Sequence, residues 1–242
     1  PGGIKPTDNS VVIGAPSQWG PVGLKGMLDE VKLYNRALKE GEVLVAQYGL
    51  TLDRGVPKLT TPRFDFDQSL QGWEGHDAER VTVSGGRLSA TLGGRGSVLM
   101  NRRLDVALKD RGFVVLRMAV TAGESGRLVF LTREGAGVLT FTLIPDGRMH
   151  TYVLKAADNS DWHGTLQALA LEPSDREARV EVESLSIAAE PEGPPEIIVK
   201  SFLPGRAVSR AGRPCHLLAI LHNTGGPGRD LSAWITVPPG VK

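Results

Sequence analysis

The feature that most constrains the fold is a series of short segments between residues 63 and 189 in which apolar and polar residues alternate. A period of two is typical of strands that bury one face. Turns such as Ser84-Gly85-Gly86 and Pro145-Asp146-Gly147 separate the segments. The candidate strands are Arg63–Phe66, Arg80–Val83, Arg87–Thr91, Ser97–Met100, Phe113–Val120, Arg127–Thr132, Val138–Leu143, Met149–Leu154, Leu166–Leu171 and Arg179–Ile187. This spacing predicts an all-β chain with an antiparallel β-sandwich of the jelly-roll type over residues 63–189.

The first 50 residues have a different pattern, which predicts the end of another domain. Residues 27–34 alternate as a half-buried strand does, and the apolar spacing of Lys39–Tyr48 indicates a short helix with Gly49 as its stop signal. Little sequence precedes this strand and helix to pack against them. We therefore expect residues 1–50 to be the C-terminal fragment of a domain, and the turn-rich residues 51–62 to be a linker.

A second linker and a further β segment follow the sandwich. Residues 190–196 are rich in proline and glutamate, which favours a stiff, polar linker. Beyond them, Ile197–Phe202, His216–His222 and Leu231–Val237 predict strands, with a turn at residues 223–226. Three short strands rarely fold alone. We therefore expect residues 197–242 to be the N-terminal part of a β module.

Three parts of the chain resemble known families. Gly26 to Leu38, which read Gly-Met-Leu-Asp-Glu-Val-Lys-Leu-Tyr-Asn-Arg-Ala-Leu, resemble the C-terminal signature of laminin-G-like (concanavalin A-like) jelly rolls, and the resemblance spans residues 10–50. Residues 197–242, with an Asn-Thr-Gly turn and a Pro-Pro-Gly end, are similar to the start of bacterial immunoglobulin-like or CARDB-like modules. The first resemblance implies a two-sheet sandwich of a kind that often binds glycans.

The central segment resembles the galactose-binding-like jelly rolls that serve as carbohydrate-binding modules in bacterial glycoside hydrolases. The motifs that carry the resemblance are Phe64-Asp65-Phe66-Asp67, Gly72-Trp73, Gly85-Gly86-Arg87-Leu88, the run from Asp146 to Tyr152, Trp162-His163-Gly164 and the terminal strand from Val180 to Ile187. In such families, oxygen ligands from the first and last strands often hold a structural calcium. The resemblance therefore implies a calcium site at Asp65, Asp67 and Glu183.

Composition excludes several classes of partner. The formal net charge is +1, from 28 basic and 27 acidic residues that are interspersed, so no long-range field draws the chain to nucleic acid or to an anionic membrane. The single Cys215 rules out an intrachain disulfide and a cysteine-based zinc site. No apolar run approaches the ~20 residues of a membrane span. We expect no nucleic-acid partner and no membrane insertion.

The sequence does not predict an enzyme. It contains no Gly-x-Ser-x-Gly, phosphate-loop or dinucleotide fingerprint, and its five histidines lack the spacing of a metal site. Glycoside hydrolysis needs two carboxylates on opposite sides of a sugar. Glu181 and Glu183 share one strand face, so we interpret them as part of a polar outer surface.

Sugar recognition combines aromatic stacking with planar polar groups. Trp162 lies in the polar stretch from Asp158 to Gly164, where it is either a stacking platform or a packing residue. His150 and Tyr152 share a strand face, and Arg117 is placed on a concave sheet. We therefore take Trp162, His150, Tyr152 and Arg117 as candidate ligand-binding residues, although aromatic residues are only 5% of the chain.

These observations lead to an expected function. The chain is predicted to be a non-catalytic carbohydrate-binding or adhesion region of a larger secreted or cell-surface multidomain bacterial protein, with an accessory role to a glycoside hydrolase as one case. The expected partners are a glycan or polysaccharide and other domains of the parent protein, and the expected location is extracellular or at the cell surface. The alternative is a set of spacer sandwiches that pack on a catalytic domain elsewhere.

Overall fold

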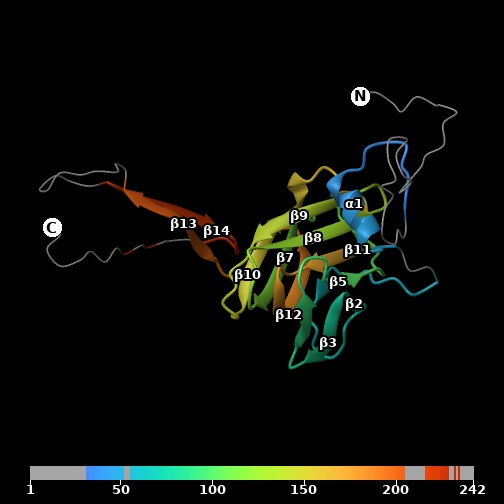
Figure 1. The fold of residues 1–242 in the computed structure, drawn as a ribbon, viewed down its shortest axis with the longest axis horizontal. Helices are drawn as coiled ribbons and strands as arrows, with labels where there is room; N and C mark the ends of the chain where they lie inside the picture. The colour runs from blue at the N-terminus through green and yellow to red at the C-terminus, as the bar shows by residue number, and fades with distance from the viewer. Residues whose placement is uncertain (1–30, 52–54, 205–215, 229–231, 233, 235–242) are drawn as a thin grey trace, which may run out of the picture. The chain divides into compact units, whose positions relative to one another are not determined.

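The computed structural model describes residues 31–51, 55–204, 216–228, 232 and 234 (Figure 1). The chain divides into two compact units, residues 1–39 and 40–242. In the first unit, the described residues 31–34 are not in a strand, unlike our expectation, and the rest of the predicted strand lies outside the described residues, as does most of the laminin-G-like signature. No helix of the described residues is long and apolar enough to span a membrane.

The second unit contains two six-stranded sheets, which confirms the all-β, antiparallel sandwich. The first sheet has the order β10-β7-β12-β4-β3, with β1 also paired to β12, and the second has the order β2-β5-β11-β8-β9, with β6 also paired to β11. The elements of this sandwich are β1 (Arg63–Phe64), β2 (Trp73–His76), β3 (Ala78–Ser84), β4 (Arg87–Gly93), β5 (Val98–Asn101), β6 (Val106–Ala107), β7 (Phe113–Val120), β8 (Ser125–Thr132), β9 (Ala136–Thr142), β10 (His150–Lys155), the 3-10 turn η1 (Ala156–Asp158), β11 (Thr165–Glu172) and β12 (Glu177–Ala188).

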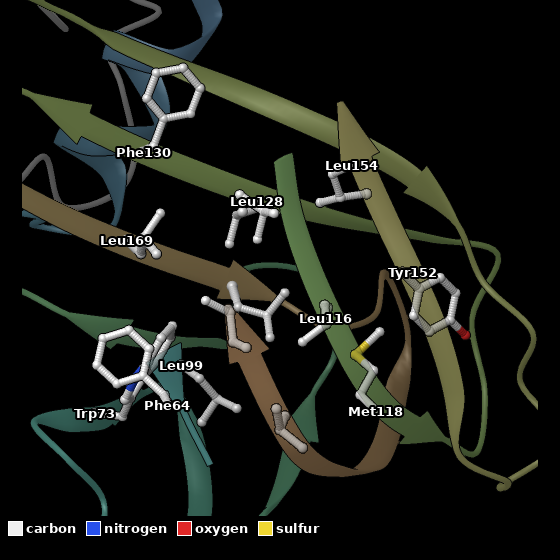
Figure 2. Close-up of a cluster of buried hydrophobic side chains, with 14 of the residues drawn as sticks. Phe64, Trp73, Leu99, Leu116, Met118, Leu128, Phe130, Tyr152, Leu154 and Leu169 are labelled. Atoms are coloured by element: carbon white, nitrogen blue, oxygen red, sulfur yellow. The ribbon is translucent and has the colours of Figure 1, made fainter. Parts of the chain in front are cut away.

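The core lies between the inner faces of the two sheets. In β7, Val114, Leu116, Met118 and Val120 alternate with less buried residues and are all 0% exposed. Figure 2 shows the side chains of Leu116 and Met118 among those of Leu128, Leu169 and other residues of the opposite sheet. Alternation in the sequence therefore reports the inner face correctly, as a half-buried strand requires.

The first and last strands of the sandwich are neighbours, because Phe64 pairs with Leu185. Strand β1 is shorter than the predicted Arg63–Phe66. Phe66 has a positive φ of 53°, a conformation outside the strand region. The side-chain oxygen of Gln71 accepts hydrogen bonds from the backbone N–H groups of Asp65 and Phe66 and replaces strand pairing there.

The short helix α1 (Glu40–Gln47) packs on the outer face of the second sheet. Leu44, Tyr48 and Leu50 form a buried cluster with residues of β5, β8 and β11, namely Val98, Met100, Val129, Ala168 and Ala170. The helix comes so close to β9 that a Cβ atom on Gly41 would lie 2.5 Å from the Cα of Gly137. Residues 40–50, which sequence analysis assigned to the preceding domain, thus contribute to the hydrophobic core of this unit.

Beyond the sandwich, β13 (Ile197–Pro204) and β14 (Leu217–Asn223) form a two-stranded antiparallel sheet. Their positions agree with two of the three strands predicted for residues 197–242. The third, Leu231–Val237, lies outside the described residues except for Ser232 and Trp234. Several apolar side chains of this hairpin are exposed, including Val199 at 62%, Leu203 at 59% and Leu218 at 58%.

Candidate functional site

The candidate site is a groove between β9 and β10, the strands at the edges of the two sheets. These strands lie near each other, next to the start of the β13–β14 hairpin (Figure 1). The groove encloses about 520 Å³, within the usual size range of small-molecule sites. Its lining comprises Ser125, Val138, Leu139, Thr140, Phe141, Thr142, Tyr152, Val153, Leu154, Lys155, Asp158, Asn159, His222, Asn223 and Thr224.

The groove exists because the chain crosses from one sheet to the other between β9 and β10. Gly147 has a φ of 74° in this connection, and the Asp146 carboxylate accepts a hydrogen bond of 2.9 Å from the N–H of Arg148. Below the groove, the rings of Phe141 and Tyr152 lie 5.3 Å apart. The Tyr152 hydroxyl accepts a hydrogen bond of 3.1 Å from the N–H of Ile144, which fixes the floor of the groove.

One end of the groove is polar but carries no net charge, because a lysine and an aspartate form an ion pair there. Lys155 Nζ lies 2.8 Å from Asp158 Oδ1, and both side chains are well exposed, at 60% and 66%. Asn159 is held in place from two sides: its Nδ2 donates to the carbonyl of Val138 at 3.3 Å, and its Oδ1 accepts from the N–H of Asp161 at 3.0 Å. Hydroxyl-bearing ligands need both donors and acceptors, and this end supplies both.

Another wall is formed by His222, Asn223 and Thr224 at the end of the hairpin, which bond to its start. We call Glu196, Asn223 and Thr224 the hairpin base. Asn223 Oδ1 accepts the Glu196 N–H at 3.0 Å, and the Thr224 N–H donates to the Glu196 carbonyl at 2.8 Å. The Thr224 carbonyl then accepts the Val153 N–H at 2.7 Å, so the hairpin base is bonded directly to the edge of β10.

Trp162 is packed in the core and does not offer a ring face to solvent. The residue is 7% exposed, its ring meets that of Phe130 edge-on at 4.9 Å, and its Nε1 donates to the Arg111 carbonyl at 2.8 Å. Of the two alternatives for this residue, the structure has the packing role. A loop position among polar residues suggested exposure, but the indole packs against Phe130 of β8.

The other three candidate binding residues do not converge on one surface. Tyr152 is 1% exposed, and burial raises the pKa of its phenol. Arg117 pairs across the strands with Thr151, so it lies on the face opposite Tyr152, where its guanidinium pairs with the Glu183 carboxylate. His150 is half-buried between two carboxylates, those of Asp146 and Glu196. Only Tyr152 lines the groove, as part of its floor.

Two of the acidic residues implied as calcium ligands have other partners. Asp65 Oδ1 accepts a hydrogen bond of 3.1 Å from Gln71 Nε2, whereas Glu183 pairs with Arg117. Within the described parts of the chain, no three His, Cys, Asp or Glu side chains are grouped as a metal site requires. Calcium binding at Asp65, Asp67 and Glu183 stays a prediction without support from this geometry.

Sequence reasoning missed most of the groove. Asp158 and Asn159 were noticed only as polar neighbours of Trp162, and Asn223 and Thr224 only as a turn. Their hydrophilic, turn-forming character was visible in the sequence. What the sequence could not show is that the edges of two different sheets and the hairpin base meet at one place.

No family model and no curated protein sequence matches this chain. Among solved structures, a mutant of the module CBM29-2 complexed with cellulohexaose has a TM-score of 0.39 and 15% identity, over 52% of this chain and 87% of that one. The N-terminal cellulose-binding domain from Cellulomonas fimi β-1,4-glucanase C has a TM-score of 0.36 and 14% identity, over 55% of this chain and 95% of that one. At these values the likeness is too weak to assign a function.

Proposed function

We propose that this chain is a non-catalytic carbohydrate-binding module that takes a neutral saccharide in the groove between β9 and β10. The observation that carries the proposal is the lining of the groove, in which apolar surface from Val138, Leu139 and Val153 adjoins hydroxyl, amide and backbone groups. Pyranose rings present C–H faces and hydroxyls together, and a site for them needs both kinds of surface.

The charges of the groove favour a neutral ligand. Lys155 Nζ lies 2.8 Å from Asp158 Oδ1, so the two opposite charges cancel locally. The remaining polar lining is mainly hydroxyl and amide: Ser125, Thr140, Thr142, Asn159, Asn223 and Thr224. A phosphate or carboxylate ligand would be expected to meet an uncompensated basic cluster instead.

The acidic residues considered for glycoside hydrolysis have other partners. Glu181 Oε2 lies 3.0 Å from Arg87 Nη1, and the Glu183 carboxylate pairs with Arg117. Each carboxylate therefore faces an arginine on the sheet surface. Two opposed, free carboxylates are what hydrolysis requires. These ion pairs support a binding role without chemistry.

The wider setting of the chain is part of the same proposal. We infer a carbohydrate-binding or adhesion region of a larger secreted or cell-surface bacterial protein, with an accessory role to a glycoside hydrolase as one case. The alternative is a structural spacer that packs on other domains. The exposed apolar side chains of β13 and β14 favour that alternative, because Val199, Leu203 and Leu218 are each more than half exposed.

The test uses two matched pairs of substitutions. Lys155→Ala with Asp158→Ala removes the ion pair at the groove, and Arg87→Ala with Glu181→Ala removes a comparable exposed pair away from it. Exposed ion pairs contribute only about 0–1 kcal/mol to stability, so both proteins should fold. Affinity electrophoresis in cellulose, mannan, xylan and galactan derivatives, followed by calorimetry, measures binding.

We expect the groove variant to bind the preferred glycan about tenfold to a hundredfold more weakly, since a hydrogen bond to a charged group contributes about 1.5–3 kcal/mol. The Arg87/Glu181 variant should bind as the natural chain does. Equal affinity of the two variants would move the site away from this groove. Absence of binding to every glycan would favour the spacer.

A further inference from the structure

We propose that His150 is a proton-dependent clamp that holds the hairpin base, and with it one wall of the groove, against strand β10. The consequence for ligand binding rests on the proposed function, whereas the clamp itself does not.

The imidazole of His150 lies between two carboxylates. Its Nε2 is 2.8 Å from Asp146 Oδ1, and its Nδ1 is 3.1 Å from Glu196 Oε2. An ionised carboxylate only accepts hydrogen bonds, and an imidazole donates from both nitrogens only when it is protonated. Both contacts are therefore satisfied together only by the imidazolium. The His150 side chain is 14% exposed, so water replaces these partners poorly.

Glu196 connects this contact to the groove. Its Oε1 accepts the Thr151 N–H at 3.2 Å, so the carboxylate bridges His150 and the backbone of β10. Its carbonyl accepts the Thr224 N–H, and the Thr224 carbonyl accepts the Val153 N–H at 2.7 Å. Val153 and Thr224 both line the groove. Release of the Glu196 carboxylate from His150 would thus loosen the segment that forms this wall.

The charges around His150 set the direction of the pH dependence. Burial disfavours the imidazolium, but hydrogen bonds and charges from Asp146 and Glu196 outweigh it and raise the pKa of His150 above its ordinary value. The Arg148 N–H, followed by His150, lowers the pKa of Asp146, so that this carboxyl stays ionised. The other ionisable groups on the same strand are the Tyr152 phenol and Lys155, and Arg148 precedes the strand. On the neighbouring elements they are Arg117 of β7, which donates to Thr151 Oγ1 and pairs with Glu183, and His222 of β14.

The raised pKa of His150 determines how docking of the hairpin base changes with pH. The docked hairpin base holds the proton on His150 more tightly than the undocked one does, so docking is favoured by protonation. The clamp is complete below pH ~6.5, the ordinary value for histidine, and is lost as the pH rises through the raised value. Each unit by which the Glu196 contact raises the pKa of His150 corresponds to a tenfold difference in the docking equilibrium.

The experiment follows the Val153 amide in the full chain by hydrogen exchange, expressed as a protection factor to remove the intrinsic pH dependence, from pH 5 to 9. The His150 pKa is measured by NMR in the same samples. We expect the protection factor to fall with increasing pH, by tenfold for each unit by which the His150 pKa of the natural chain exceeds that of Glu196→Gln, in which the Asp146 contact remains. Glu196→Gln should lower the His150 pKa and flatten the profile, and His150→Gln should give the high-pH protection at every pH. The exposed Glu192→Gln is the matched control and should behave as the natural chain does.

A protection factor that is constant across this pH range, or a pH profile that survives in His150→Gln, would overturn the clamp. Glycan binding is measured separately at pH 5.5 and 8.5. A chain that shows the exchange profile but binds no glycan at either pH would refute the proposed function and leave the clamp intact. A chain that binds a glycan but shows a flat exchange profile would refute the clamp and leave the proposed function intact.

Discussion

The attachment of residues 40–50 to the sandwich leads to a quantitative prediction about Tyr48. The Tyr48 hydroxyl donates to Glu172 Oε2 at 3.0 Å, and Glu172, which is 1% exposed, also accepts the Gly96 N–H at 2.9 Å. Arg127 completes the network, with its Nη2 2.5 Å from the same carboxylate oxygen and 3.1 Å from the Tyr48 oxygen. The helix end is thereby bonded to β8 and β11.

We expect Tyr48→Phe to lower the free energy of unfolding by about 1.5 kcal/mol, the low end for a hydrogen bond to a charged group, because Arg127 and the Gly96 amide still satisfy Glu172. Glu172→Gln should cost about 3 kcal/mol. Removing one partner of a buried ion pair costs about 3–5 kcal/mol, and water partly compensates Arg127, whose side chain is 20% exposed.

Urea unfolding monitored by tryptophan emission is the assay, because Trp73 and Trp162 are buried within the sandwich and report on its unfolding. Tyr34→Phe is the matched control, since Tyr34 is 45% exposed in the other compact unit, and it should change the free energy by less than ~0.5 kcal/mol. If Tyr48→Phe changes the sandwich transition as little as Tyr34→Phe does, then residues 40–50 do not stabilise the sandwich and the reasoning is wrong.

The buried phenol of Tyr48 should also make the free energy of unfolding depend on pH. Burial, with a contribution from the Glu172 carboxylate, raises the pKa of Tyr48 to about 12. The folded chain then binds the phenolic proton more tightly than the unfolded chain, so stability should fall as the pH rises from ~10 toward that value. The difference in unfolding free energy between the natural chain and Tyr48→Phe should shrink over this window. A constant difference would contradict the buried hydroxyl.

Three further predictions concern other parts of the sandwich. Trp162→Ala should destabilise the fold by about 3–5 kcal/mol, measured by urea unfolding, because it removes a buried ring; a fully stable variant would mean that the ring is not packed. Gly137→Ala should cost about 1–3 kcal/mol in the same assay, since its Cβ would lie 2.3 Å from Phe130 Cζ, and no loss would indicate a looser approach. Asp175→Asn should lower the free energy of unfolding near neutral pH, because the Glu124 and Ser125 N–H groups lower the pKa of Asp175, and this difference should shrink as the pH falls through that lowered value; a difference that stays constant with pH would refute this.

The sequence was sufficient to predict the parts of the fold that depend on local patterning. Strand β7 was predicted with the bounds Phe113–Val120 that the structure has, because its alternation is long and bounded by turn residues. Helix α1 differs from the predicted Lys39–Tyr48 by one residue at each end. Strand β2 (Trp73–His76), in contrast, was missed, because only Trp73 is buried and the strand has no alternating pattern.

The candidate site was less predictable because it depends on which strands meet. His150 and Tyr152 do share one face of a strand, but Tyr152 is part of the core whereas His150 is half-buried beside Glu196, 46 residues away. The residues around Trp162 are polar, as in an exposed loop, yet its Nε1 donates a hydrogen bond to the Arg111 carbonyl that holds the ring inward. Such long-range contacts leave no local signal in a single sequence.

The groove also changes how the chain is divided into functional parts. Val153 belongs to the predicted sandwich and Thr224 to the predicted terminal module, yet a hydrogen bond of 2.7 Å joins them at the groove. The Gly193 Cα in the intervening linker lies so close to Thr151 that a Cβ atom would be 2.9 Å from its Cγ2. Because the linker and the hairpin base are in contact with β10, residues 190–196 hold in place the end of the hairpin, where Asn223 and Thr224 line the groove. Any affinity measured for the sandwich without them would omit one wall of the groove.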